Sequence, residues 1–194
     1  MRAPPRPDYW ANAVITHTMA DSRRETWERV LAPYQQDVKY VLEIGSYEGQ
    51  SALFWCNFFP DAHVTCVDSW EDKDVAKGCT SGREVESHFD KNTLGLPVTK
   101  MKLKSTAALV RLATYTFDFI YVDGDHTRLQ VMTDSCLAWG LLRSGGIMVW
   151  DDYRDYRPDL IDRPTPAIDA FVFVMKSDLE IIHDSGQQLI VRKR

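Results

Sequence analysis

Apolar residues along the chain form short runs that alternate with longer helical patterns. The short runs are rich in Val, Ile and Phe, which predicts buried strands. The expected strands cover residues 39–44, 63–68, 98–103, 117–123 and 146–152. In the segments between them apolar residues recur at helical spacing, which predicts helices. The expected helices cover residues 49–59, 82–92, 105–113 and 127–142, the last closed by the residues RSGG.

Both ends of the chain add to this alternation. Before the first strand we expect a helix that is capped by Asp21 or Ser22 and has apolar residues at helical spacing from Trp27 to Tyr34. After the fifth strand come a polar loop and a further helix over 166–177. Two last strands, at 179–184 and 187–193, are expected to pair as a hairpin.

This order of elements predicts an α/β, Rossmann-like fold. Five β-α units imply a doubly wound, mostly parallel sheet, which the C-terminal antiparallel hairpin extends to seven strands. We interpret residues 1–194 as one domain, in which 1–37 form an N-terminal arm and helix that could serve as a lid and 38–194 form a cofactor-binding core. Segments 18–27, 71–82 and 153–166 are further lid candidates. Ligands of such sheets bind beyond the carboxyl ends of the strands.

Composition excludes several classes of partner. The net charge is −5, so no global basic field favours nucleic acid. No apolar run approaches the ~20 residues that span a membrane. The four cysteines include no C-x-x-C pair, which indicates reduced thiols. Because we find no apolar leader segment, we take the cytoplasm as the default location.

The first strand ends in a glycine-containing turn, within the stretch VLEIGSYEGQS. Its pattern is Glu43-x-Gly45-x-x-x-Gly49, where Gly45 allows a sharp turn and Gly49 lets a helix begin close to a ligand. A dinucleotide fingerprint would need glycine at positions 47 and 50, where this chain has Tyr47 and Gln50. An acid at the turn also repels phosphate. The turn therefore predicts a ligand with hydroxyls or a cationic centre, and S-adenosylmethionine (SAM) has both.

The second strand ends at Asp68, whose carboxylate can accept hydrogen bonds from ribose hydroxyls. Trp70 and Ser105 are candidates for the adenine environment. The alternatives are a core position for Trp70 and a helix cap for Ser105. The predicted cofactor-binding residues are Glu43, Gly45, Ser46, Tyr47, Gly49, Ser51, Asp68, Ser69, Trp70, Ser105 and Asp123.

A second group of acids follows the fourth and fifth strands, in the stretches VDGDH and VWDDY. If these strands are neighbours, Asp123 and Asp151 emerge side by side and their charges repel. A divalent cation would offset this repulsion, and hard oxygen ligands suit magnesium. We therefore predict Asp123, Asp151 and Asp152 as metal ligands, and Asp125 as a turn residue.

A metal at this position could hold an acceptor hydroxyl and lower its pKa. His126, three residues after Asp123, could then take the proton. The alternative for His126 is a hydrogen-bonding residue of the acceptor site or a group that supports the metal ligands. The predicted catalytic residues are His126 and Asp123.

The stretch VLEIGSYEGQSALFW resembles the first motif of class I SAM-dependent methyltransferases. It is similar to the form found in catechol O-methyltransferase and in macrolide sugar O-methyltransferases. The resemblance covers residues 39–152, and the terminal hairpin fits the same fold. Catechol-type enzymes carry Glu where this chain has Asp68. The resemblance implies that the cofactor site is lined by Glu43, Gly45, Tyr47, Ser51 and Asp68.

The second group of acids resembles the same enzymes. In the metal-dependent catechol type, an acid ends the fourth strand and a second acid follows 28 positions later, which is the separation of Asp123 and Asp151. The catechol type has Asp-Asn at the second position, whereas this chain has Asp151-Asp152. Its catalytic base is Lys, but some macrolide sugar enzymes have His there, as at His126. The resemblance implies O-methylation of a small polar molecule of sugar, polyketide or phenolic type.

Other functions remain open at this stage. One is a SAM-binding N- or C-methyltransferase without metal, and another is a non-catalytic module that binds SAM or a nucleoside. A nicotinamide-dependent oxidoreductase is a third, which the glycine spacing disfavours. The expected partner is a small-molecule acceptor, with no nucleic acid and no membrane. The oligomeric state cannot be read from the sequence, and a homodimer is an open alternative.

Overall fold

The computed structural model describes the whole chain except residues 1–7, 17, 19, 72–80 and 155–162. Most of the lid candidates 71–82 and 153–166, and the start of the predicted N-terminal arm, therefore lie outside the described residues. The lid candidate 18–27 is almost wholly described, because it is largely the first helix.

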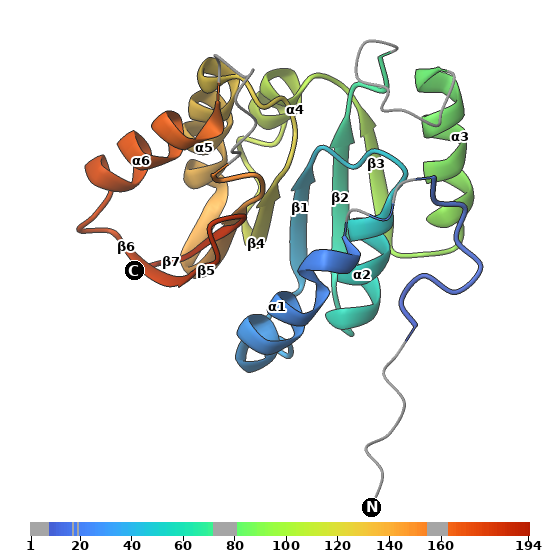
Figure 1. The fold of residues 1–194 in the computed structure, drawn as a ribbon, viewed down its shortest axis with the longest axis horizontal. Coiled ribbons are helices and arrows are strands. Elements are labelled where there is room, and N and C mark those ends of the chain that lie inside the picture. Colours follow the sequence, from blue (N-terminus) through green and yellow to red (C-terminus); the bar gives the residue numbers. More distant parts are fainter. Residues whose placement is uncertain (1–7, 17, 19, 72–80, 155–162) are drawn as a thin grey trace, which may run out of the picture.

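The described residues form one seven-stranded sheet in the order β3-β2-β1-β4-β5-β7-β6 (Figure 1). β1 to β5 run parallel, whereas β7 is antiparallel to both of its neighbours, β5 and β6. This confirms the predicted mostly parallel sheet with a terminal hairpin. The strands are β1 (Tyr40–Ile44), β2 (His63–Asp68), β3 (Val98–Lys102), β4 (Phe117–Val122), β5 (Leu142–Trp150), β6 (Leu179–Asp184) and β7 (Leu189–Lys193).

Helices cover both faces of the sheet (Figure 1). On one face pack α1 (Asp21–Leu31), which continues into a 3-10 turn (Ala32–Tyr34), α2 (Gln50–Phe58) and α3 (Gly82–Asn92). On the other face pack α4 (Ser105–Arg111), α5 (Arg128–Leu141) and α6 (Pro164–Val174). Burial of both faces explains why β1, β2 and β4 are apolar runs rather than alternating patterns, whereas the edge strand β3 is only partly buried.

The first face has an aromatic core. Trp27 of α1 is fully buried between Phe54 and Trp55 of α2, with ring centroids 4.9 and 4.5 Å away. The ring of Trp27 also meets Tyr121 of β4 edge-on at 5.7 Å. This packing fixes α1 against the sheet, next to the carboxyl end of β4.

Several predicted boundaries were wrong. α1 begins at Asp21 with Ala20 at its N-cap, and not after a cap at Asp21 or Ser22, because the Ala20 amide donates to Gln50 Oε1. Ser105 is the first residue of α4 and not its cap, since Lys104 holds that place. α6 starts at Pro164, two residues earlier than expected. The RSGG residues do not close α5 but belong to β5, which starts directly after the helix.

Candidate functional site

The candidate site lies where the central strands end together. Register places Ile44 opposite Val67 on one side and Val122 on the other, and Val122 opposite Trp150. The next residue of each strand is held to its neighbour: the Asp123 amide donates to Ile44 O at 2.8 Å, and the Asp151 amide donates to Val122 O at 3.0 Å. Gly45, Asp123 and Asp151 therefore emerge side by side, at the point where the strand order reverses.

Gly45 is required for this close arrangement. Its φ is +90°, and a Cβ built on it would lie 1.9 Å from the carbonyl oxygen of Asp123. Gly49, with φ +81°, is the N-cap of α2, and a Cβ there would press on the ring of Phe89 at 3.1 Å. The two glycines thus allow β1, the turn and α2 to pack against β4 and α3.

Glu43 lies beneath the turn and is fully buried. Its carboxylate accepts a hydrogen bond from Trp55 Nε1 at 3.0 Å and faces Cys66 Sγ at 3.6 Å. Burial raises the pKa of Glu43, and a hydrogen bond from Ser51 acts in the opposite direction. Glu43 is absent from the residues that line the pocket, so it supports the turn from below through Ser51, which does line it.

Asp68 organises the second half of the cofactor turn. Its Oδ2 accepts the Tyr47 amide at 2.9 Å, and its Oδ1 accepts the Trp70 amide at 2.8 Å. Trp70 Nε1 in turn donates to Tyr47 O at 2.9 Å, and its ring packs on Phe89. Trp70 is only 5% exposed, so it is a core aromatic that also touches the pocket region.

Two pockets adjoin these residues. The first is lined by residues at the ends of β4 and β5, in the turn after β1 and at the start of α2, and by Ala20. These residues are Gly45, Ser46, Tyr47, Glu48, Gln50, Ser51, Tyr121, Asp123 and Asp151. The second is lined by Ser69, Trp70, Glu71, Arg83, Lys102, Leu103 and Lys104. Most predicted cofactor residues border one of the two. Ser105 borders neither, and its hydroxyl accepts from Gln130 of α5 at 3.0 Å.

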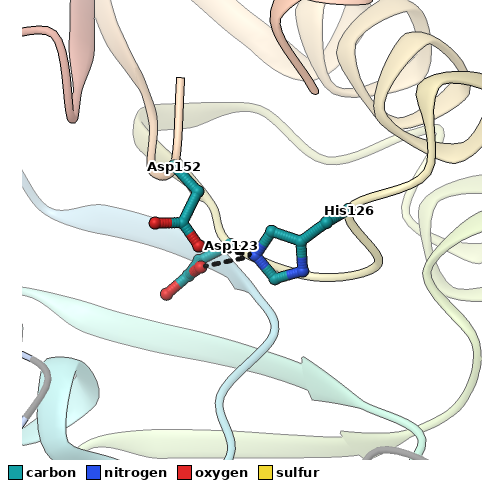
Figure 2. A group of neighbouring side chains, drawn as sticks. All are labelled: Asp123, His126 and Asp152. Carbon is teal, nitrogen blue, oxygen red and sulfur yellow. Dashed lines mark ion pairs between the residues drawn. The ribbon is translucent and has the colours of Figure 1, made fainter. Parts of the chain in front are cut away.

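An acidic group with a histidine lies beside the first pocket. His126, in the loop after β4, points its Nε2 at Asp152 Oδ2 and Asp123 Oδ1, at 2.9 and 3.6 Å (Figure 2). One ligand atom from each of Asp123, His126 and Asp152 lies within 4.8 Å of the others. Among the described residues, this is the group whose geometry could hold a metal ion.

The pKa values of these groups reflect their crowding. Burial, and then repulsion by Asp151, raise the pKa of Asp123 to about 7, although His126 lowers it. Burial alone would lower the pKa of His126, but the adjacent Asp123 and Asp152 outweigh burial and raise it to about 10. Without another cation, His126 is therefore protonated at neutral pH and acts as a counter-ion to the acids.

Asp151 differs from its two acidic neighbours because its carboxylate contacts Tyr121 and Arg23 rather than His126. Oδ2 accepts the hydroxyl of Tyr121 at 2.6 Å. Oδ1 accepts Arg23 Nε at 3.2 Å and the amide of Asp152 at 2.8 Å. Asp151, itself a predicted metal ligand, thus lies beside Asp123 and Asp152, but in this arrangement its carboxylate faces Tyr121 and Arg23 and the potential metal group contains His126 in its place.

A family model described as a methyltransferase domain matches residues 42–153, more than half of the chain and all of the strand ends described above. The chain belongs to this methyltransferase family. An uncharacterized protein of Acanthamoeba polyphaga mimivirus is 27% identical over 139 residues, which are 67% of this chain and 58% of that protein. The chain thus spans less than two thirds of that relative.

Three solved structures with the same fold are methyltransferases. The MycE methyltransferase of mycinamycin biosynthesis, in complex with Mg and SAH, aligns with TM-score 0.66 and 17% identity, over 97% of this chain and 55% of that one. TomG of Streptomyces achromogenes, an O-methyltransferase of tomaymycin synthesis in complex with SAM, aligns with TM-score 0.65 and 17% identity, over 97% and 91%. The O-methyltransferase of Bacillus cereus in complex with SAH aligns with TM-score 0.64 and 15% identity, over 97% and 92%. At these identities the likeness shows the fold.

Sequence reasoning missed three residues of this methyltransferase site: Arg23, Glu48 and Tyr121. Tyr121 had a signal, because a tyrosine two positions before Asp123 in an apolar strand lies on the same face of the sheet. Glu48 is 1% exposed and lies within the recognised turn, but nothing marked it as buried. Arg23 had no signal, since its contact with Asp151 joins residues 128 positions apart.

The described residues contain no helix that is both long and apolar enough to cross a membrane.

Proposed function

We propose that this methyltransferase transfers the methyl group of SAM to a hydroxyl of a small polar molecule, with a divalent cation at the acidic group. The observation that carries the proposal is that β1, β4 and β5 end together. The glycine turn, Asp123 and Asp151 therefore line the same pocket. The acceptor oxygen must approach the methyl carbon in line with the carbon–sulfur bond that breaks. This arrangement puts the residues that would bind the methyl donor next to those that would bind the acceptor.

Two features support SAM as the cofactor. Among the described residues, the first pocket is lined by the acids Glu48, Asp123 and Asp151 and by no Lys or Arg, which favours a cationic ligand over a phosphate. Asp68 ends β2 beside the second pocket, the position from which a carboxylate can meet ribose hydroxyls. The SAM and SAH bound in TomG and MycE are consistent with this assignment.

The acidic group fits a divalent cation. Asp123 and Asp152 offer hard oxygen ligands, and burial, followed by repulsion from Asp151, raises the pKa of Asp123 to about 7, which disfavours its anion in a way that a bound cation would offset. The residues proposed to hold the ion are Asp123, Asp151 and Asp152. A cation bound there would supply Lewis acidity toward an acceptor hydroxyl.

We propose His126 as the general base. Its Nε2 lies 2.9 Å from Asp152, and its pKa of about 10 comes from the two carboxylates that a cation would neutralise. Once their charge is offset, His126 loses the cause of its raised pKa and can accept a proton near neutral pH. Asp123, which lines the same pocket as the glycine turn, would hold the cation and in that way position the acceptor between His126 and the methyl group.

Calorimetric titration tests this function. Chelator-treated wild-type protein is titrated with S-adenosylhomocysteine and then with MgCl2, and the titrations are repeated on Asp152→Ala. We expect wild type to bind both, and the variant to bind the nucleoside normally while its Mg²⁺ affinity falls by at least about tenfold, because an oxygen ligand is lost. Asp125→Asn is the matched control, since Asp125 belongs to the same acidic loop but accepts the amide of Thr127.

A second candidate is methyl transfer without metal. The observation that favours it is that Arg23 and His126 already place two cations against Asp151, Asp152 and Asp123. Turnover of an identified acceptor, measured in excess EDTA, separates the two. Activity that survives EDTA means that Arg23 and His126 alone offset the charge of the three acids. Activity restored only by Mg²⁺ means that the divalent cation offsets it.

A further inference from the structure

The N-terminal segment, defined here as the described residues from 8 to 20, lies over the cofactor turn. Trp10 Nε1 donates to Gln50 O at 2.8 Å, and the Ala20 amide donates to Gln50 Oε1 at 3.0 Å. Between these anchors, the amide and the hydroxyl of Thr16 both donate to the carboxylate of Glu48 at 2.8 Å. Ala20 itself lines the first pocket. The segment is therefore held against the cofactor turn, and its last residue forms part of the pocket wall.

Arg23 joins the end of this segment to the acidic group. It lies in the first turn of α1, three residues after Ala20, and its side chain is 16% exposed. Its Nε and Nη2 both lie 3.2 Å from Asp151 Oδ1, and Nη2 lies 3.3 Å from Asp152 Oδ1. One guanidinium thus bridges two of the three acids.

Tyr121 fixes the acid that Arg23 contacts. The Tyr121 hydroxyl donates to Asp151 Oδ2 at 2.6 Å, and the Asp151 side chain is only 7% exposed. Because Asp151 is held on one side by β4 and on the other by α1, a shift of Arg23 must be felt at both the acidic group and the N-terminal segment.

We propose that Arg23 is a positioning residue with two effects of opposite sign. Through Asp151 it holds the N-terminal segment over the cofactor pocket and so strengthens cofactor binding. As a cation already bound to Asp151 and Asp152, it weakens the binding of a divalent cation to the same acids. This inference rests on the proposed function, because it assumes that SAM or its product occupies the first pocket.

The test compares Arg23→Gln with Arg29→Gln in the full chain. Arg29 is an exposed residue in the last turn of the same helix, so its variant makes the same charge change away from the site. Calorimetry measures S-adenosylhomocysteine affinity, and a separate titration measures MgCl2 affinity of the chelator-treated protein. For Arg23→Gln we expect about tenfold weaker nucleoside binding, from the loss of charged hydrogen bonds. We expect ~3–10-fold tighter Mg²⁺ binding, because one positive charge leaves the site. Arg29→Gln should match wild type in both.

Arg23→Lys separates charge from geometry. Lysine keeps the positive charge but cannot bridge two carboxylates in the planar manner of a guanidinium. Its Mg²⁺ affinity should therefore stay near that of wild type, while its nucleoside affinity is only partly restored. Limited proteolysis gives a readout independent of ligands: cleavage within residues 8–20 should be faster in Arg23→Gln than in Arg29→Gln.

The outcomes are distinguishable. If wild type binds the nucleoside and Mg²⁺ but Arg23→Gln leaves both affinities unchanged, the role of Arg23 is refuted and the proposed function stands. If Arg23→Gln weakens both ligands alike, Arg23 is a purely structural contact and the inference is also refuted. If folded wild type binds no S-adenosylhomocysteine, the proposed function itself fails, and the inference fails with it.

Discussion

At the scale of single residues, the site concentrates unfavourable backbone conformations. Tyr47, Trp70 and Asp152 have positive φ angles of 45, 46 and 51° although none is glycine. Such residues cost about 1–3 kcal/mol each and persist only where their surroundings hold them. Here each one donates its amide to an aspartate: Tyr47 and Trp70 to Asp68, and Asp152 to Asp151. The acids at the strand ends therefore shape the backbone of the site as well as its charge.

Gly45 provides the clearest prediction at this scale. In Gly45→Ala the new Cβ would collide with the Asp123 carbonyl, 1.9 Å away, in addition to the strain of φ +90°. We expect a loss of more than about 4 kcal/mol in the free energy of unfolding, measured by urea denaturation. Gly95→Ala is the matched control, since Gly95 has φ +78° with nothing within 4 Å. Its cost should be only about 1–2 kcal/mol, and equal losses in the two variants would refute the steric argument.

At the scale of elements, α4 and α5 are joined through a partly buried polar contact. Gln130 of α5 donates to Ser105 Oγ at 3.0 Å and to Asp134 Oδ1 at 2.8 Å. Asp134 is 1% exposed, and burial raises its pKa to about 6. Ser105, predicted as a cap or an adenine contact, therefore serves to attach α4 to its neighbouring helix.

The raised pKa of Asp134 predicts a pH-dependent stability. An acid whose pKa is higher in the folded than in the unfolded protein destabilises the fold as it ionises. The cost is absent below pH 4, grows as pH rises, and is complete above pH 6 to 7. Asp134→Asn should therefore be more stable than wild type at pH 7.5, by about 1–2 kcal/mol, and the gain should vanish near pH 4. Urea denaturation at both pH values measures this, and a gain that does not change with pH would contradict it.

At the scale of the whole molecule, the first described helix, α1, is bonded to the last hairpin of the chain. Trp27 Nε1 donates to Gln188 Oε1 at 2.9 Å, across 161 positions of sequence, and both residues are buried. The same helix carries Arg23 to the acidic group and packs on α2. The N-terminal helix is therefore part of the core of this methyltransferase and not an appendage to it.

A double-mutant cycle tests this link. Trp27→Phe leaves the buried Gln188 oxygen without its donor, and Gln188→Met leaves the Trp27 N–H without its acceptor. Each single change should cost about 1–3 kcal/mol of unfolding free energy, because a buried polar group loses its partner. The double variant should cost less than the sum of the two, by about 1–2 kcal/mol. Strict additivity in urea denaturation would show that the two side chains are not coupled.

The sequence by itself determined the order of elements and the class of fold. Apolar runs that alternate with helical patterns are local signals, and they placed β2 and α3 at their observed bounds. The spacing of Glu43, Gly45 and Gly49, and the acids after β4 and β5, also marked where a site would form. Those residues are close in sequence to the strand ends that position them, so local pattern was sufficient.

Only the tertiary structure decided what each acid contacts. Glu43 lies beneath the turn, Asp68 holds two backbone amides, and Asp151 faces Arg23 and Tyr121 rather than His126. Apart from the contact of Asp68 with Trp70, two residues further on, these contacts depend on helix packing and strand register over 12 to 128 residues, which no local pattern encodes. The sequence did not predict the position of Arg23 for the same reason. The burial of Trp27 in the aromatic core brings the Arg23 guanidinium to the site, and the residues next to Arg23 in sequence do not indicate this.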